Sequence, residues 1–302
     1  MAPLDASAPT DDPSRARQQE AAPESYVPQH TRPSRAGRNL PAAIGVGVTL
    51  GGIVVASLFL WKLAFLAVVA VAAGVGTWEM VRAVRPSGAR PPMTPLLVGA
   101  VGLIALAWYA GPEALPLGLL GVLLAMLLWR IADGAPGYQR DVVFGALIVM
   151  YVPFLASVAV LLARPADGDL RVLVTLATVV LSDTGGYVSG VFFGRHPMAP
   201  SVSPKKSWEG LVGSLVWAAA GGAIMLHFAL DVIWWQGAIF GVAVSAASVL
   251  GDLAESLLKR DLSIKDMSNL LPGHGGLMDR LDSILLAAPT AYAVLAFVAP
   301  AG

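Results

Sequence analysis

Long apolar segments dominate this chain and limit what it can fold into. From Leu40 onward, nine stretches are apolar and long enough for a membrane-crossing helix, which needs ~20 residues. They span 40–60, 63–83, 94–111, 115–132, 143–163, 170–193, 208–229, 232–258 and 278–299. Since 56% of the 302 residues are hydrophobic and only 13% are charged, the sequence predicts an all-α, polytopic transmembrane helical bundle of about nine membrane helices.

The first 39 residues have a different composition. They are rich in Pro, Ser, Ala and Gln, and they contain no apolar stretch that could form a core. Such a segment cannot bury enough apolar surface to offset the entropy of ordering. It also lacks the charged start and adjacent apolar core of a secretory signal peptide. We therefore expect a disordered cytoplasmic tail at 1–39, followed by an integral-membrane domain at 40–302.

The basic residues predict how the helices are oriented, because Lys and Arg accumulate in the cytoplasmic loops of membrane proteins. With a cytoplasmic amino terminus, 17 of the 20 Lys and Arg residues fall on the cytoplasmic side, and only Lys62, Arg164 and Arg171 fall on the other. The pattern predicts a protein of the cytoplasmic membrane whose loops 194–207 and 259–277 face the cytoplasm. Its carboxy terminus is then expected on the opposite side.

Net charge and cysteine content exclude several classes of function. Lys and Arg number 20, as do Asp and Glu, so the formal charge is zero and no nucleic-acid partner is expected. The chain has no cysteine. Disulfides, thiolate nucleophiles and cysteine-ligated zinc or iron–sulfur sites are therefore excluded.

Acidic residues within the apolar segments indicate a functional site. An ionised side chain at bilayer depth costs ~2.5–3.5 kcal/mol on insertion scales, so it needs a partner or a wet cavity. Apart from Glu79, these acids lie in the last four segments, mostly near the ends expected in the cytoplasm: Asp183, Glu209, Asp252, Glu255, Asp279 and Asp282.

Two helical faces carry such acids on either side of one loop. Asp252, Glu255 and Lys259 share a face of the eighth segment, and Asp279 and Asp282 share a face at the start of the ninth. Carboxylates from two helices, together with substrate phosphates, suit the ligand preference of Mg²⁺. Aspartates at a helix start also interact favourably with the helix dipole. The spacing leaves both interpretations open.

A glycine-rich loop precedes the last segment. It reads LLPGHGG from Leu270 to Gly276, and backbone amides beside glycine can approach a phosphate closely. Its candidate phosphate contacts are Gly273, His274, Gly275 and Gly276. Alone, PGHGG is more typical of a tight turn, but the nearby cations Lys259, Arg260 and Lys265 favour a polyphosphate.

A second basic loop, SVSPKKSWEG from Ser201 to Gly210, carries the same kinds of residue. Lys205 and Lys206 supply charge, Ser207 supplies a hydroxyl, and Glu209 lies in the first turn of the next segment. A lysine pair beside a membrane helix is ordinarily a topology signal. The recurrence of basic, hydroxyl and acidic residues nevertheless favours contact with a phosphate or a lipid headgroup.

Small residues recur along the sixth segment, where Gly186, Gly190 and Gly194 are spaced every four residues. Such a stripe lets membrane helices approach closely, so we expect it to pack against a neighbouring helix.

Three motifs resemble those of a known family. The run SLLKRDLSIKDMSNLLPGHGGLMDRLD, from Ser256 to Asp282, resembles the signature of the phosphatidate cytidylyltransferase (CDP-diacylglycerol synthase) family without a departure. SDTGGYVSGVFFG at Ser182 to Gly194 and SPKKSWEG at Ser203 to Gly210 resemble its flanking motifs. The amino-terminal half agrees only in consisting of apolar helices, and the polar tail is an addition.

The resemblance implies a membrane-bound nucleotidyltransferase of phospholipid biosynthesis. Its substrates would be CTP and phosphatidic acid, its products CDP-diacylglycerol and pyrophosphate, and its cofactor Mg²⁺, with a second cation as an option. The family's metal-binding aspartates carry over to Asp252 and Asp279, and Asp282 and Asp183 are further candidates for the same cluster.

The resemblance also suggests roles for the basic residues. Lys259, Arg260 and Lys265 are assigned to the triphosphate, and His274 with the glycine loop to the leaving pyrophosphate. The other candidate substrate-binding residues are Lys205, Lys206, Ser207, Gly273, Gly275, Gly276 and Arg280. A lipid bilayer is an implied partner, and a homodimer is a further expectation.

Two other functions stay open at this point. A CTP-dependent, polyprenol-type lipid kinase would need similar charges but would transfer the γ-phosphoryl group. A cation-coupled transporter would also explain acids in membrane helices, yet it predicts charges near the midplane and a repeated architecture, which the sequence does not display.

Overall fold

The computed structural model describes residues 40–134, 136–271 and 275–300, with side chains from residue 45 onward. The expected tail at 1–39 lies outside these residues. In the described part, the helices are α2 (Leu40–Leu60), α3 (Lys62–Val84), α4 (Met93–Tyr109), α5 (Leu115–Asp133), α6 (Tyr138–Val149), α7 (Leu155–Ala163), α8 (Gly168–Phe193), α9 (Trp208–Leu230), α10 (Trp234–Asp261) and α11 (Met278–Val298).

These helices confirm the nine expected apolar segments, because α6 and α7 form one span. They are joined by a π-helical turn, Met150–Phe154, which contains Pro153. Proline lacks the N–H that an α-helix requires, so the hydrogen bonding changes locally while the chain keeps its direction. Single-turn 3₁₀ helices at Arg85–Ser87 and Pro112–Ala114 extend α3 and precede α5.

Seven of the described spans are long and apolar enough to cross a membrane, so the chain is an integral membrane protein. Two shorter apolar helices, Gly45–Leu60 and Met93–Tyr109, accompany them. α10 has 28 residues, or ~42 Å at 1.5 Å per residue. It is therefore longer than a hydrocarbon layer of ~30 Å, and its polar last turns can extend beyond that layer.

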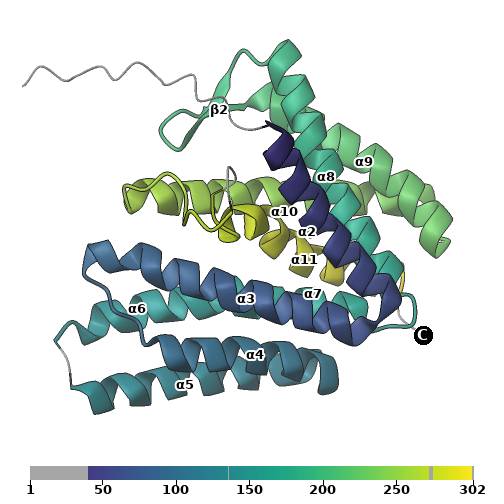
Figure 1. Ribbon diagram of the computed structural model, residues 1–302. Coiled ribbons are helices and arrows are strands. Elements are labelled where there is room, and N and C mark those ends of the chain that lie inside the picture. The colour runs from purple at the N-terminus through teal and green to yellow at the C-terminus, as the bar shows by residue number, and fades with distance from the viewer. Residues whose placement is uncertain (1–39, 135, 272–274, 301–302) are drawn as a thin grey trace, which may run out of the picture. The chain divides into compact units, whose positions relative to one another are not determined.

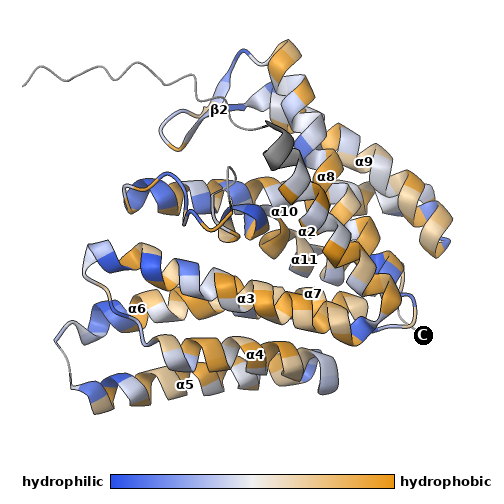
Figure 2. Cartoon of the chain, in the orientation of Figure 1, coloured by the Kyte–Doolittle hydropathy of each residue, from blue (hydrophilic) through white to orange (hydrophobic). Residues whose placement is uncertain are grey.

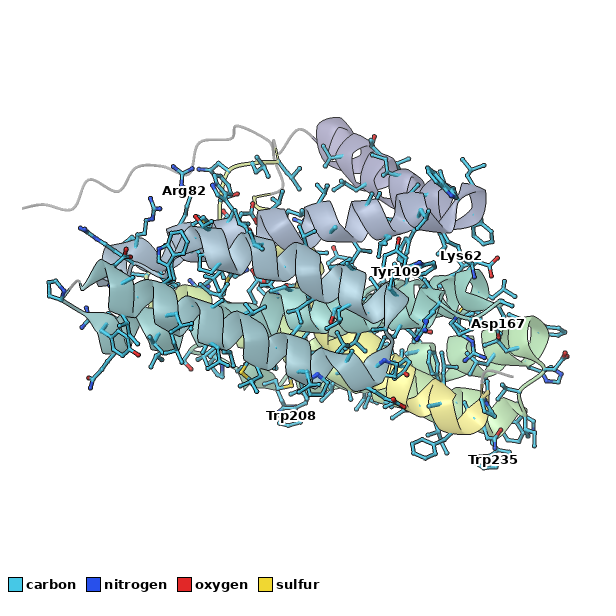
Figure 3. All side chains as sticks on the ribbon, turned by 90° about the horizontal axis from the view of Figure 1, so that it is seen from below. Lys62, Arg82, Tyr109, Asp167, Trp208 and Trp235 are labelled. Atoms are coloured by element: carbon cyan, nitrogen blue, oxygen red, sulfur yellow. The ribbon has the colours of Figure 1, made fainter. Side chains whose placement is uncertain are left out.

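Polar residues gather at one end of the helices. In Figure 2 the hydrophilic colour is concentrated where α10 and α3 end and α6 begins, and on the β2 hairpin, whereas the middle of the helices is mostly apolar. Figure 3 shows Arg82 at this end and Lys62, Tyr109 and Asp167 at the other. The described helices therefore place the candidate site residues of the last segments together at one polar end.

Glycines set the close approach of the carboxy-terminal helices. α8 packs along α9, and a Cβ on Gly185 would lie 2.6 Å from the Cβ of Trp217. On the predicted stripe, Gly186 faces Ser214 and Gly190 faces Gly210 of α9. The expected packing role of the stripe is thus confirmed. Figure 1 shows α8 and α9 beside each other, with α10 and α11 next to them.

Buried apolar residues form two clusters that hold the helices together. One joins α3, α4 and the α6–α7 span and also includes Met267 and Met278, which flank the glycine-rich loop. The other centres on α8, α10 and α11, with Phe240 and Leu295 fully buried. The residues on either side of this loop are therefore packed against the amino-terminal helices as well as against α10.

A short antiparallel hairpin, β1 (Pro197–Ala199) and β2 (Ser203–Ser207), replaces the loop expected at 194–207. The amino-acid pattern at 194–207 did not predict these strands. Glu209 stabilises the hairpin base, because its carboxylate accepts hydrogen bonds from the amides of Arg195 and His196 and lies 2.6 Å from His196 Nδ1.

Candidate functional site

The acidic faces of α10 and α11 meet at the polar end of these helices. Lys259 Nζ of α10 lies 2.8 Å from Asp279 Oδ1 of α11 and 3.2 Å from Glu255 Oε1. The helices approach closely at Gly251, where a Cβ would collide with the Asp282 carbonyl oxygen. The glycine therefore allows side chains that are 20 residues apart in the sequence to form one charged cluster.

Asp279 also holds the loop that precedes its helix. Its Oδ2 accepts hydrogen bonds from the amides of Met267 at 2.9 Å and Gly276 at 2.8 Å. Leu271 donates its amide to the Gly275 carbonyl at 2.8 Å, and Gly275 has a φ of +81°. That backbone region is accessible to glycine at little cost, so the glycine shapes the turn that brings the Gly276 amide to Asp279.

Glu79 of α3 is a site residue whose role the sequence pattern did not predict. Its carboxylate is fully buried and accepts hydrogen bonds from the amides of Leu277 at 3.0 Å and Met278 at 2.7 Å. It also accepts the Ser268 hydroxyl at 2.5 Å. The only signal in the sequence was a lone acid inside an apolar segment, and its partners lie up to 199 residues away.

The hairpin and α10 are linked by an ion pair, in which Lys206 Nζ lies 2.6 Å from Asp252 Oδ2. Arg260 Nε donates to the Val202 carbonyl at 3.3 Å, which adds a second link. Ser207 caps α9 by accepting the Gly210 amide at 3.1 Å. The two predicted basic loops therefore lie beside the same carboxylate-bearing helix.

Asp183 and Asp282 complete the acidic group from α8 and α11. Asp183 lies close enough to Asp252, Asp282 and Lys206 for their charges to interact, and Asp282 likewise interacts with Asp252 and Asp279. The structure thus brings all four predicted metal aspartates to one region.

The carboxylates suit a hard cation by their chemistry. Carboxylate oxygens are preferred ligands of Mg²⁺, and Glu255 Oε2 is buried with no hydrogen-bond donor among the described residues. Among the described residues, however, no three acidic or histidine side chains are arranged as ligands of one ion. Lysine ammonium groups lie against the carboxylates of Asp252 and Asp279 in this structure.

The remaining predicted residues lie around this cluster or outside the described part. Lys205 and Lys265 are exposed and, within the described residues, form no ion pair. Arg280 is exposed on the first turn of α11. Gly273 and His274 lie outside the described residues.

The arrangement combines basic side chains with carboxylates at the end of an apolar bundle. Lysine and arginine side chains bind phosphate oxygens through charge-assisted hydrogen bonds. Apolar helices beside them can accommodate the tails of an amphiphile. The site is therefore chemically suited to bring a soluble polyphosphate and a membrane-bound anion together.

Comparisons with known proteins agree with this reading. A model described as the cytidylyltransferase family matches residues 41–298. The chain is 41% identical over 300 residues to a phosphatidate cytidylyltransferase of Mycobacterium bovis, covering 95% of each chain. It is 40% identical to one of Mycobacterium leprae, covering 86% of this chain and 89% of the relative. A chloroplastic phosphatidate cytidylyltransferase of Arabidopsis thaliana is 29% identical over 82% of this chain and 69% of its own length.

Proposed function

Because this chain belongs to the cytidylyltransferase family and converts CTP and phosphatidate into CDP-diacylglycerol and pyrophosphate, we propose that the reaction occurs between α10, α11 and the β1–β2 hairpin. The observation that carries this proposal is the convergence of two lysine–aspartate pairs, Lys206–Asp252 and Lys259–Asp279, beside the glycine-rich loop.

The reaction joins two anions. A phosphate oxygen of phosphatidate attacks the α-phosphorus of CTP and forms the new P–O bond. The bond between the α-phosphorus and the α–β bridging oxygen breaks, and pyrophosphate leaves with its electron pair. No general base is needed, because phosphatidate is already ionised at neutral pH. Positioning and charge neutralisation must therefore supply most of the catalysis.

The basic residues divide between the two substrates. Lys259, Arg260 and Lys265, at the end of α10 and in the following loop, bind the triphosphate, with Gly275, Gly276 and Arg280 nearby. Lys205, Lys206 and Ser207 of the hairpin contact the phosphatidate headgroup or a CTP phosphate. As part of this proposal, Gly273 and His274 lie close to the leaving pyrophosphate.

Asp252 and Asp279 would hold Mg²⁺, with Asp282 and Asp183 as further oxygen ligands and as the place for a second cation. When bound, Mg²⁺ would neutralise phosphate charge that otherwise opposes the approach of the substrates. The support for this assignment is the carboxylate donor set and the Glu255 Oε2 atom beside it, which is buried with no hydrogen-bond donor in the described part of the chain. Lys206 and Lys259 would then release their carboxylates and contact phosphate oxygens instead.

The remaining expectations follow from the charge pattern. We place the site and the amino terminus in the cytoplasm and the carboxy terminus on the opposite side of the cytoplasmic membrane, since CTP is cytoplasmic and the basic residues gather at the site end. The tail at 1–39 and the membrane domain at 40–302 stay predictions from the sequence. The homodimer stays a prediction, and measuring the molecular mass of the protein in detergent would test it.

Separately labelled substrates test the reaction. The purified protein is incubated in detergent micelles with phosphatidic acid, Mg²⁺ and CTP labelled at either the α- or the γ-phosphorus. We expect the α label in the lipid and the γ label in released pyrophosphate. Transfer of the γ label to lipid would identify a lipid kinase instead, and no transfer of either label would contradict the proposed reaction.

A further inference from the structure

We propose that Glu79 is a positioning residue that holds the catalytic end of α11 from a helix in the other half of the bundle. The inference rests on the proposed site, because it concerns the orientation of Asp279. Glu79 lies on α3, its side chain is fully buried, and the carboxylate accepts three hydrogen bonds from the segment that contains Ser268, Leu277 and Met278.

α11 does not cap its own amino terminus. Leu277 occupies the N-cap position and provides no side-chain hydrogen bond. The first amides of a helix lack partners within the helix and carry partial positive charge. Glu79 supplies the missing acceptor and a negative charge from a different helix, with distances of 3.0 Å to the Leu277 amide and 2.7 Å to the Met278 amide.

The same carboxylate ties the preceding loop to this helix start. Its Oε1 accepts both the Ser268 hydroxyl and the Leu277 amide. A Cβ on Gly276 would lie 2.8 Å from Glu79 Oε1, so glycine leaves the space that the carboxylate needs. Glu79 therefore holds the loop and the helix at a single point.

Glu79 and Asp279 bind neighbouring amides. Asp279 accepts the Gly276 amide, while Glu79 accepts those of Leu277 and Met278. The backbone position of residues 276–278 determines where the Asp279 carboxylate lies relative to Lys259. Glu79 thus acts on the site through Asp279, without contacting the proposed substrates.

Glu79→Gln is the most direct variant to test this role. Each oxygen of the Glu79 carboxylate accepts a hydrogen bond from a backbone N–H, that of Leu277 or that of Met278. In Glu79→Gln, one of these N–H groups must therefore face the side-chain NH₂ group, which cannot accept a hydrogen bond. We expect kcat to fall between about tenfold and a hundredfold, since a displacement of ~1 Å in a site costs roughly 10²-fold. The KM for CTP should change less, and the Mg²⁺ concentration for half-maximal rate should rise. Glu79→Asp, which keeps the charge, should recover part of kcat.

Ser268→Ala extends the test to the loop. Because Ser268 is proposed to act through Glu79, its loss should lower kcat in the parent but add little to Glu79→Gln, giving a non-additive double-mutant cycle. Asp141→Asn is the matched control, since Asp141 is equally buried but pairs with Arg130 at 2.6 Å at the start of α6. It should lower the Tm and leave the kcat of the folded enzyme unchanged.

Comparing Glu79→Gln with Asp141→Asn distinguishes a role of Glu79 in positioning the site from a role in folding. If Glu79→Gln lowers the Tm as Asp141→Asn does but keeps the parent kcat and Mg²⁺ dependence, Glu79 is structural only and the inference is wrong. If Glu79→Gln cannot be purified, an unchanged kcat in both Glu79→Asp and Ser268→Ala overturns it. The reaction of the parent, measured first with α-labelled CTP, tests the proposed function independently.

Discussion

Lys259 on α10 and Asp279 on α11 form an ion pair between two helices, with Nζ and Oδ1 2.8 Å apart and side-chain exposures of 16% and 7%. Removing one partner of a buried pair costs about 3–5 kcal/mol where the other charge is left uncompensated, whereas Lys259 would keep Glu255 Oε1 at 3.2 Å if Asp279 were removed. The pair thus connects the stability of the helix contact to the presence of both groups that we assign to catalysis.

Asp279→Asn should abolish Mg²⁺-dependent activity while the protein still inserts into the membrane. The variant loses the charge that pairs with Lys259 and is proposed to hold the cation, and its amide cannot accept all three hydrogen bonds at that carboxylate. Initial rates across Mg²⁺ concentrations, with size-exclusion profiles in detergent, provide the measurement. Asp169→Asn is the control, because Asp169 lies in the first turn of α8, at the end of that helix away from the proposed site. Activity near that of the parent would rule out the metal assignment.

Lys206→Ala should raise the apparent KM for one substrate more than Lys205→Ala does. Lys206 is half-buried and lies 2.6 Å from Asp252, whereas Lys205 is exposed. A hydrogen bond to a charged group contributes about 1.5–3 kcal/mol, or roughly tenfold to a hundredfold in KM, while an exposed charge contributes at most about 1 kcal/mol. Steady-state kinetics with each substrate varied check both variants. Unchanged kinetics in the double variant would leave the lysine pair as a topology signal alone.

Gly275→Ala should destabilise the loop before α11 and lower activity. Gly275 has a φ of +81°, and a Cβ there would lie 2.9 Å from Asp279 Oδ2. The left-handed backbone conformation alone costs a residue with a Cβ about 1–2 kcal/mol. Gly134→Ala is a matched control, because its φ is +55° and a Cβ would contact nothing within 4 Å. Thermal unfolding compares the stability of the two variants. Rate measurements should show a loss of activity for Gly275→Ala alone. Equal behaviour of the two variants would contradict the role of Gly275 at Asp279.

Asp167→Asn should reduce stability at neutral pH and have less effect in acid. The Arg171 guanidinium donates to both Asp167 oxygens, at 2.9 and 2.8 Å, and this hydrogen bonding lowers the pKa of the Asp167 carboxyl. Since the folded-state pKa lies below the unfolded value, the pair stabilises the protein above the unfolded pKa and loses this contribution as pH falls through the folded pKa. The side chain is 37% exposed, so solvent screening keeps the effect below about 1 kcal/mol. Thermal unfolding at pH 7 and pH 3 measures the difference between parent and variant, and a difference that stays constant with pH would contradict the prediction.

The helices and their number could be predicted from the sequence because helix formation in a membrane depends on local properties. Length and apolarity over ~20 residues suffice to identify a span, and the segments 40–60 and 115–132 differ little from α2 and α5. The packing of Gly186 against α9 was also predictable, since a four-residue repeat of small residues lies on one helical face.

The candidate site was predictable in its residue types and in the helices that carry them, but not in its contacts. The spacing of Asp252, Lys259 and Asp279 indicated two charged faces, yet only the tertiary structure paired Lys206 with Asp252 and joined the β1–β2 hairpin to α10. The base of the hairpin is hydrogen-bonded to Glu209, which lies outside both strands.

Glu79 marks the limit of what the sequence determined by itself. Its apolar surroundings required that a charge there have a partner, but nothing near it in the chain identified one. Its partners Ser268, Leu277 and Met278 are 189 to 199 residues away. Only the packing of α3 against the start of α11 brings them together, because hydrogen bonds of 2.5 to 3.0 Å depend on the positions of whole helices. The sequence determined the membrane helices and the family of this protein, and the tertiary structure decided which charges meet.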